Sequence, residues 1–467
     1  MATTLIDSDY FAGMYTSSRM KEIFCDEARF QAWLDVEGAL ARAQARLGII
    51  PEDAAEKITE AATMDNIDIA AMTEHFRVSG FPILPIVNQL NNALDEETRR
   101  YSHWGSTTQD ITDTGQALML KNGLSHLEKT LILVEDALIA LSEKYRDTVM
   151  VGRTMGNQAT PITFGYKTAI WLAEFLRHRE RLKEYRPRIE VGQIAGAVGT
   201  NASLGSRGLE VLSETMKELG LGEAPITWHV SRDGWTEATF LLGLIAATCA
   251  KIAAEIGLLM RTEIAEVSEP YETGRGGSST LPQKRNPIIC PTVVATGRMA
   301  REKVGLALDC MVAQHERDVG GGHLEWTLLP ETFVLTGGAL EKILELLRGL
   351  VVDKKRMREN LELTKGLVMS EAAMMALADY AMYAAVLAHI GPVALAVTTS
   401  LHIDFMRRPE QADILAKARL MKLGRVLAVG AVELTQEGLS GPVAHASCFT
   451  PPRSHPSRSR SPRQPRQ

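Results

Sequence analysis

The strongest hydrophobic pattern in this chain is a regular apolar seam between residues 113 and 145. Its members are spaced alternately four and three apart: Leu120, Leu124, Leu127, Leu131, Val134, Leu138 and Leu141. This spacing keeps the apolar side chains on one face of a helix, as in a heptad repeat. We therefore predict one long helix over this stretch, packed along its length against other helices.

Four further stretches carry helical periodicity or residues typical of helix ends: 27–47, 236–267, 291–311 and 331–351. The least polar run, residues 238–250, is too short to cross a bilayer, so we expect a buried helix and no membrane contact. Alternating apolar and polar positions never extend beyond a few residues. The pattern thus predicts an all-α fold built on a bundle of long helices.

Composition narrows the functional classes. A chain of 467 residues, 45% of them hydrophobic, can bury the cores of several domains. The net charge of -6 argues against a dedicated nucleic-acid binder. Five dispersed cysteines without a CxxC pair indicate reduced thiols and a cytoplasmic setting. The eleven histidines show no metal-ligand spacing and no nucleotide loop is present, so we expect no metal and no organic cofactor.

Three polar loops interrupt the helices. They read "HWGSTTQDITDTG" at residues 103–115, "GRTMGNQATPITFG" at 152–165 and "GRGGSSTLPQKRNPIIC" at 274–290. Each loop taken alone could be an ordinary connection between helices. The third one combines glycines, hydroxyls and cations in a way that suggests chemistry.

In the third loop, glycines allow backbone N–H groups to converge on one point. A serine hydroxyl is a poor base, but N–H donors and a nearby cation such as Lys284 can stabilise its oxyanion. Lys284 and Asn286 together suit a carboxylate, one as a charge and one as an amide donor. This set of groups fits the removal of a proton next to a carboxylate.

The segment "GSSTLPQKRNP", residues 277–287, resembles the signature loop of the fumarase/aspartase superfamily. "GSTTQD" at 105–110 and "QHERDVGGGHLEWTLLPE" at 314–331 are similar to other blocks of that family and occur in the expected order. The resemblance covers roughly residues 8–375. It implies a three-domain, all-α fold with a central long-helix bundle, in a homotetramer whose active sites are each built from three subunits.

On this resemblance we expect an N-terminal helical domain at residues 1–112, the bundle at 113–360 and a small C-terminal helical domain at 361–449. We also expect the heptad face of residues 120–141 to be buried between subunits. Beyond Ala378 the chain departs from the family's pattern, and the sequence gives no physical account of this region. Residues 450–467, rich in arginine and proline, are expected to form a disordered tail.

The resemblance also assigns roles to residues. Ser278 would be the catalytic base. The substrate-binding residues would be Ser279, Lys284, Asn286, Thr107, Thr108, Gln109, Thr154, Gln158 and His103. In this scheme Lys284 and Asn286 hold one carboxylate, and residues 107–109 hold a second carboxylate or the developing enolate. For His103 a structural hydrogen bond is an equal alternative, and Asp110 is expected to cap and position the first loop.

Within the superfamily, Met155 stands where fumarases and adenylosuccinate lyases usually carry a histidine. This feature, with the tryptophan of "HLEW", resembles the 3-carboxy-cis,cis-muconate cycloisomerase branch. That branch implies proton abstraction on a di- or tricarboxylate, in aromatic catabolism, without a cofactor. Two alternatives remain open. One is a C–N lyase or epimerase acting on an N-substituted aspartate such as iminodisuccinate; the other is an inactive helical scaffold.

Overall fold

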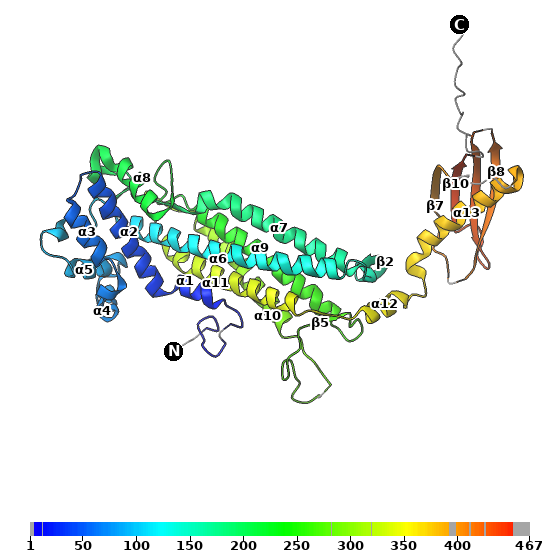
Figure 1. Ribbon diagram of the computed structural model, residues 1–467, viewed down its shortest axis with the longest axis horizontal. Coiled ribbons are helices and arrows are strands. Elements are labelled where there is room, and N and C mark those ends of the chain that lie inside the picture. Colours follow the sequence, from blue (N-terminus) through cyan, green and yellow to red (C-terminus); the bar gives the residue numbers. More distant parts are fainter. Residues whose placement is uncertain are drawn as a thin grey trace, which may run out of the picture. The chain divides into compact units, whose positions relative to one another are not determined.

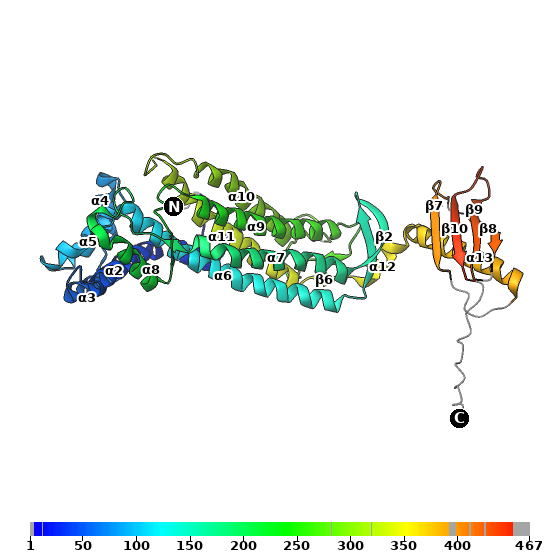
Figure 2. The ribbon, with the colours of Figure 1, turned by 90° about the horizontal axis from the view of Figure 1, so that it is seen from above.

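The computed structural model describes residues 4–11, 13–281, 283–318, 320–391, 398–410, 412–424 and 426–451. The chain forms two compact units. The first comprises residues 1–148 and 164–354, and the second comprises residues 149–163 and 355–467. Figures 1 and 2 show the elements of both units in two orientations.

Five long helices form the bundle of the first unit (Figure 1). They are α6 (Thr108–Lys144), α7 (Phe164–Ile189), α9 (Asp233–Leu259), α10 (Ile289–Asp309) and α11 (Gly321–Arg348). The five helices expected from the sequence are confirmed with shifted ends: four are α6, α9, α10 and α11, and the fifth, expected at 27–47, is α2 (Asp26–Arg46). Helix α7 was not expected. The largest shift is in α11, which starts ten residues before the expected Glu331 and includes Pro330. The run of glycines at its start masked the helix in the sequence.

Shorter elements complete the first unit. The helices there are α1 (Ser18–Phe24), α2 (Asp26–Arg46), α3 (Glu52–Ala61), α4 (Ile69–Ser79), α5 (Ile83–Asn92) and α8 (Gly208–Leu219). Two-residue strands pair as β3 (Val191–Gly192) with β4 (Gly222–Glu223), and as β5 (Val267–Ser268) with β6 (Val351–Val352). Short 3-10 turns are η1 (Met64–Asn66), η2 (Thr98–Tyr101) and η3 (Ala202–Arg207).

The heptad seam of α6 lies inside the first unit. Leu120, Leu124, Leu127, Leu131, Val134 and Leu138 are fully buried within one chain. At Gly123 a methyl group would come within 2.8 Å of the Phe333 ring, so α6 and α11 pack very closely there. The expectation that this face is buried between subunits is therefore wrong. The other bundle helices of the same chain already cover the seam.

The second unit contains a helix packed on a sheet. It comprises the hairpin β1 (Val149–Thr154)–β2 (Asn157–Thr163), α12 (Lys354–Glu362), η4 (Leu367–Met369), α13 (Ser370–Ile390), β7 (Ser400–Phe405), β8 (Ile414–Leu423), β9 (Ala428–Gln436) and β10 (Ala444–Thr450). The last four strands form an antiparallel sheet in the order β7-β10-β9-β8. Its core joins Met374, Met382 and Val386 of α13 to Val432 and Leu434 of β9.

The small helical domain expected at residues 361–449 is therefore wrong from residue 400 onward, where strands replace helices. A short signal was present, because residues 416–420 of β8 and 432–435 of β9 alternate apolar and polar side chains with the period of two that a half-buried strand requires. Residues 452–467, most of the expected tail, lie outside the described residues. The expected boundary at residue 112 stays a prediction.

The buried seam gives a stability prediction. We expect Leu127→Ala to lower the free energy of unfolding by about 2–5 kcal/mol, because it leaves a cavity among fully buried side chains. The matched control is Lys129→Ala on the exposed side of the same helix, with an expected change below about 0.5 kcal/mol. Urea unfolding followed by circular dichroism measures both. Equal midpoints for the two variants would contradict the assignment.

Candidate active site

The first polar loop is fixed by one buried carboxylate, Asp110. Its oxygens accept hydrogen bonds from the N–H groups of Thr107, Ala195 and Gly196 at 2.9, 3.0 and 2.9 Å, and its Oδ1 lies 2.9 Å from His229 Nε2. Asp110 is fully buried at the first turn of α6. These contacts fix the approach of the loop to the helix N-terminus. The expectation that Asp110 caps and positions the loop is confirmed.

His103 also has a structural partner. Its Nδ1 lies 2.5 Å from Oε1 of the buried Glu37 and 3.1 Å from the Ser106 hydroxyl. Burial lowers the pKa of His103, but the charge of Glu37 and its hydrogen bond outweigh that effect, so the net pKa is raised. This geometry favours the structural alternative over a substrate contact.

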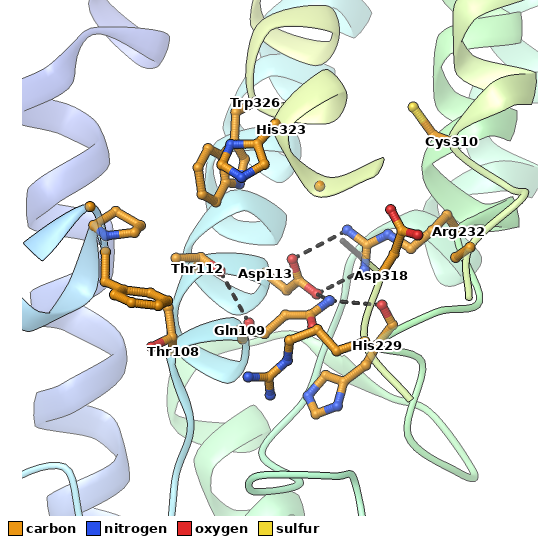
Figure 3. Close-up of a pocket in the computed structure, with 16 residues that line it drawn as sticks. Thr108, Gln109, Thr112, Asp113, His229, Arg232, Cys310, Asp318, His323 and Trp326 are labelled. Carbon is orange, nitrogen blue, oxygen red and sulfur yellow. Dashed lines mark hydrogen bonds and ion pairs between the residues drawn. The ribbon is translucent and has the colours of Figure 1, made fainter. Parts of the chain in front are cut away.

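A pocket of about 270 Å³ opens at the N-terminus of α6. Residues that line it include Phe81, Thr108, Gln109, Arg317, His323 and Trp326. Figure 3 shows His323 and Trp326 on one side of the pocket and Gln109 on another. The two rings meet edge to face, with centroids 4.8 Å apart. The pocket therefore combines an aromatic wall with the positive end of a long helix.

Below the pocket lies a buried ion network centred on Arg232. Its guanidinium bonds to Asp113 at 2.8 and 3.2 Å and to Glu325 at 3.0 Å (Figure 3 shows the contact with Asp113). Burial lowers the pKa of Arg232, but the two carboxylates outweigh it and the net pKa is raised. Burial also raises the pKa of Glu325, against the opposing charge of Arg232. The network joins α6 and α11 to the first residues of α9 and holds the pocket floor in place.

The hydrogen bonds of the Gln109 side chain give it a structural role. Its amide nitrogen donates to Asp113 Oδ2 at 3.0 Å and to the carbonyl of His229 at 2.7 Å (Figure 3). Both amide hydrogens are therefore used, and its carbonyl oxygen is buried. In this geometry the Gln109 side chain has no N–H group left to donate to a substrate carboxylate. It positions the first turn of α6, and Thr108 lies beside it at the pocket.

A cation that sequence reasoning did not single out borders the pocket. Arg317 donates to the Thr107 hydroxyl at 3.1 Å and to the carbonyl of Ala197 at 3.0 Å. The rest of its guanidinium is available at the pocket surface, because Arg317 is exposed. Arg317 lies in the block at 314–331 that carried part of the resemblance, but nothing in that block distinguished it from the other residues.

In the third loop, two backbone N–H groups donate hydrogen bonds to the Ser278 hydroxyl. Its Oγ accepts from the N–H groups of Thr280 and Leu281 at 3.3 and 3.1 Å. Gly276 has a φ of 70°, and its carbonyl accepts from the backbone N–H of Asn286 at 2.8 Å, which closes the loop. The Asn286 side chain donates to the same carbonyl at 3.2 Å. Two backbone N–H groups thus point at the Ser278 hydroxyl.

The end of that loop is anchored by Glu269. This buried carboxylate accepts from the N–H groups of Ile288, Ile289 and Cys290 at 2.8, 3.0 and 2.7 Å, at the N-terminus of α10. Lys284 and Ser279 are exposed on the loop. Burial raises the pKa of the Cys290 thiol, which agrees with a packing role and not with a nucleophile.

The Ser278 loop and the pocket lie far apart in one chain. The loop leads into α10, and Cys310, directly after the other end of α10, lines the pocket. A helix of 21 residues is about 31 Å long. Figure 1 shows the loop beside β5, away from the N-terminus of α6. One copy of the first unit therefore does not bring Ser278 to Thr108.

The second polar loop is the turn of the β1–β2 hairpin, in the second unit. Thr154 pairs with Asn157, and Met155 and Gly156 form the turn with positive φ angles of 51° and 79°. Met155 is 98% exposed at its tip. The Gln158 amide donates to the carbonyl of Asn360 at 3.0 Å within the same unit. Thr154 and Gln158 thus belong to the second unit, whereas the first and third loops belong to the first.

No group of three or more His, Cys, Asp or Glu side chains that could hold a metal ion occurs among the residues the structure describes. The donors at the pocket are hydroxyl, amide and guanidinium groups, which suit a carboxylate. Together with the Ser278 loop they offer the parts needed to remove a proton beside a carboxylate.

Comparisons with known proteins identify the family of the chain. Residues 13–300 match the protein family described as Lyase, and residues 368–441 match the Thioesterase superfamily. The 3-carboxy-cis,cis-muconate cycloisomerase of Acinetobacter baylyi is 40% identical over 378 residues, 80% of this chain and 84% of that protein. The N-acetyl-S-(2-succino)cysteine lyase of Enterococcus italicus is 41% identical over 374 residues, 80% of this chain and 82% of that protein.

Solved structures are similar over the same part of the chain. The 3-carboxy-cis,cis-muconate lactonizing enzyme of Pseudomonas putida is 38% identical with a TM-score of 0.75, covering 79% of this chain and 83% of that one. A fumarate lyase of Mesorhizobium sp. BNC1 is 42% identical with a TM-score of 0.73, covering 78% and 82%. By these matches the chain is an enzyme that belongs to the lyase family of the fumarase/aspartase superfamily.

Proposed function

We propose that the enzyme abstracts a proton next to a carboxylate of a di- or tricarboxylate, in cycloisomerase chemistry of the 3-carboxy-cis,cis-muconate type. The observation that carries this proposal is the pair of backbone N–H groups on Ser278 Oγ. Two such donors stabilise the alkoxide of Ser278 and make its hydroxyl a usable base. Lys284 on the same loop supplies positive charge for the substrate carboxylate whose neighbouring carbon loses the proton.

A second carboxylate of the substrate would bind at the pocket. Thr108 and the N-terminus of α6 supply hydroxyl and backbone donors, and Arg317 supplies a charged fork. Phe81 and Trp326 provide an apolar wall that fits a flat, unsaturated carbon skeleton. Thr107 acts through its bond to Arg317, and Gln109 acts by positioning the helix turn.

The enzyme would open a lactone in one direction and close it in the other. Proton loss beside the carboxylate leaves an enolate-like dianion, and the C–O bond to the ring oxygen then breaks as the C=C bond forms. The reverse sequence closes the ring. Several similar relatives support this proposal, because they carry the name 3-carboxy-cis,cis-muconate cycloisomerase. A role in aromatic catabolism follows if that substrate is correct.

A second substrate class shares the first step. The relative named N-acetyl-S-(2-succino)cysteine lyase, at 41% identity, would release a thiol from a succinyl group after the same proton loss. C–N cleavage or epimerisation of an N-substituted aspartate such as iminodisuccinate would also start from that carbanion. The four chemistries differ only in which bond, if any, breaks next, so a substrate panel separates them.

The complete site would be shared between subunits of a homotetramer. The length of α10 keeps the Ser278 loop away from the pocket of the same copy. Exposed apolar side chains on the bundle helices, among them Ile132, Leu133, Ile139 and Phe240, offer a surface for neighbouring copies. A cytoplasmic location fits the five cysteines, which are free thiols.

The second unit has a candidate function of its own, thioester hydrolysis. Besides the match to the Thioesterase superfamily, a pocket of about 380 Å³ lies between α13 and β7, lined by Met375, Asp379, Thr398, Thr399, Ser400 and Leu401. Oδ1 of Asp379 is buried, with no hydrogen-bond partner among the described residues. A carboxylate there could activate water for attack on a thioester carbonyl, releasing a carboxylic acid and a thiol.

The role of Ser278 is tested by Ser278→Ala. We expect the variant to keep the fold and lose at least about 100-fold in kcat, because the proton acceptor is gone. The purified protein is assayed on carboxymuconate, iminodisuccinate, N-acetyl-S-(2-succino)cysteine, adenylosuccinate and malate. The control is Ser206→Ala, an exposed serine outside the site. Near-normal turnover by Ser278→Ala on the best substrate would contradict the assigned role.

The shared site is tested by complementation. We expect Ser278→Ala and Arg317→Ala chains to be inactive alone and, after mixing in one tetramer, to regain about a quarter of wild-type activity, because one site in four then receives both intact residues. The control mixes two preparations of Ser278→Ala alone, which should stay inactive. Mixed tetramers without any recovered activity would show that each site comes from one chain.

The second candidate is tested by Asp379→Asn. We expect the wild-type chain to hydrolyse acyl-thioesters, with released thiol measured by a chromogenic disulfide, and the variant to lose at least about 100-fold in rate. Lyase activity should not change in the variant. Absence of thioester hydrolysis in the wild-type chain over a panel of short, aromatic and dicarboxylic acyl groups would rule this function out.

A further inference from the structure

Another pocket of the first unit lies on the side of the bundle, between α7 and α9. These two helices run side by side in both views (Figures 1 and 2). The pocket has a volume of about 300 Å³. Its lining residues are Glu174, Arg177, His178 and Arg181 from α7 and Leu244, Ala247, Thr248 and Lys251 from α9. None of them belongs to the pocket at the N-terminus of α6 or to the Ser278 loop.

The spacing of these residues along each helix explains why they share one pocket. On α7 they stand at positions 174, 177, 178 and 181, and on α9 at positions 244, 247, 248 and 251. Residues separated by three, four and seven positions lie on one face of a helix. One stripe of each helix therefore forms a wall of the pocket, and most of the charged side chains come from α7.

The floor of the pocket is a fixed chain of hydrogen bonds. Thr248 donates its hydroxyl hydrogen to Glu174 Oε2 at 3.1 Å, so its oxygen accepts from Nε2 of the buried His178 at 2.8 Å. The other ring nitrogen, Nδ1, then accepts from the Arg181 guanidinium at 3.3 Å. This assignment requires a neutral imidazole. The pKa of His178 is lowered to about 4, first by burial and then by the charge of Arg181, which keeps the ring neutral near pH 7.

The charges at the pocket do not cancel. Its described lining holds three cations, Arg177, Arg181 and Lys251, and one carboxylate, Glu174. Glu174 forms an ion pair with Lys251, so these two charges balance each other. Among the residues that the structure describes, no carboxylate lies within ion-pair distance of either arginine. Two positive charges therefore border the pocket without a counter-charge.

The two arginines repel each other. Side chains four residues apart are neighbours on a helix, and like charges at this spacing destabilise it. The Arg177 side chain is exposed, and Arg181 uses one N–H group for His178. A guanidinium carries five N–H donors in a planar fork, so both side chains keep donors for a further partner. An anion between them would remove the repulsion and accept those hydrogen bonds.

From this arrangement we propose that the pocket binds a small divalent oxyanion, either inorganic phosphate or a dicarboxylate, between Arg177 and Arg181. Guanidinium groups match the oxygens of phosphate and carboxylate through pairs of parallel N–H donors. A divalent anion balances both uncompensated charges. A carboxylate side chain of a second copy is the competing occupant, but its single charge would leave one arginine unbalanced. The site does not depend on the lyase reaction, so it can be tested without an activity assay.

The test is titration calorimetry of the full chain with inorganic phosphate, sulfate and succinate, at an ionic strength held constant with chloride. At least one of these anions should bind with a Kd of about 1 mM or below. Arg177→Gln should weaken that binding at least about tenfold, because it removes one of the two charges. The control is Lys183→Gln, an exposed cation of α7 outside the pocket, which should keep the Kd within about twofold of the wild-type value.

The choice of anion identifies the source of the ligand. Binding of phosphate and sulfate that depends on Arg177 assigns the site to inorganic oxyanions, and binding of succinate that depends on Arg177 assigns it to dicarboxylates. A further variant, Arg177→Glu, places a carboxylate four residues before Arg181. It should abolish the binding and raise the Tm measured without added anion, because an ion pair replaces the repulsion.

Three results would overturn the proposal. The first is an equal Kd for the wild-type chain and Arg177→Gln. The second is a Kd above about 10 mM for all three anions, which is too weak for a built site. The third is a smaller assembly of Arg177→Gln in light scattering, because it would show that a carboxylate of a second copy occupies the pocket.

Discussion

The rigid length of α10 is the constraint on which the account of the active site depends. At one end of this helix Glu269 caps the backbone and fixes the Ser278 loop. Beyond the other end, Cys310 borders the pocket at the start of α6. About 31 Å of helix cannot bend enough to bring the two together. In the proposed mechanism, the base and the carboxylate pocket would therefore meet through different copies of the chain.

Buried charged side chains fix the geometry of the pocket and of the loop beside it. Asp110 satisfies three backbone N–H groups and contacts His229, and Arg232 joins Asp113 to Glu325. Groups this deeply buried tolerate little displacement, because a lost partner leaves an unpaired charge in a low-dielectric interior. The loops that face the substrate are thus fixed by side chains that never touch it. This explains why polar loops can keep their geometry at the ends of long apolar helices.

Much of the first unit could be predicted from the sequence, because long amphipathic helices and a glycine-serine loop leave clear patterns. Asp110 as a cap and the donors around Ser278 followed from local chemistry. The roles of Gln109 and Arg317 could not, because the first depends on contacts with Asp113 and His229, and the second on a contact with Thr107 from a distant segment. The heptad seam predicted the helix but not which helices cover its apolar face. Periodicity shows that a face is buried without showing which chain buries it.

The strands of residues 400–450 were missed because a resemblance over residues 8–375 led to the expectation of more helices. The alternation in β8 and β9 was readable on its own. Where the match to the family ends, local periodicity is the better guide to secondary structure.

The central claim is that the lyase site exists only in the assembled protein. The most direct measurement is specific activity against protein concentration, with light scattering on the same samples. The account predicts that activity per chain falls in step with dissociation and that monomers are inactive. A monomer that keeps full activity per chain would contradict it.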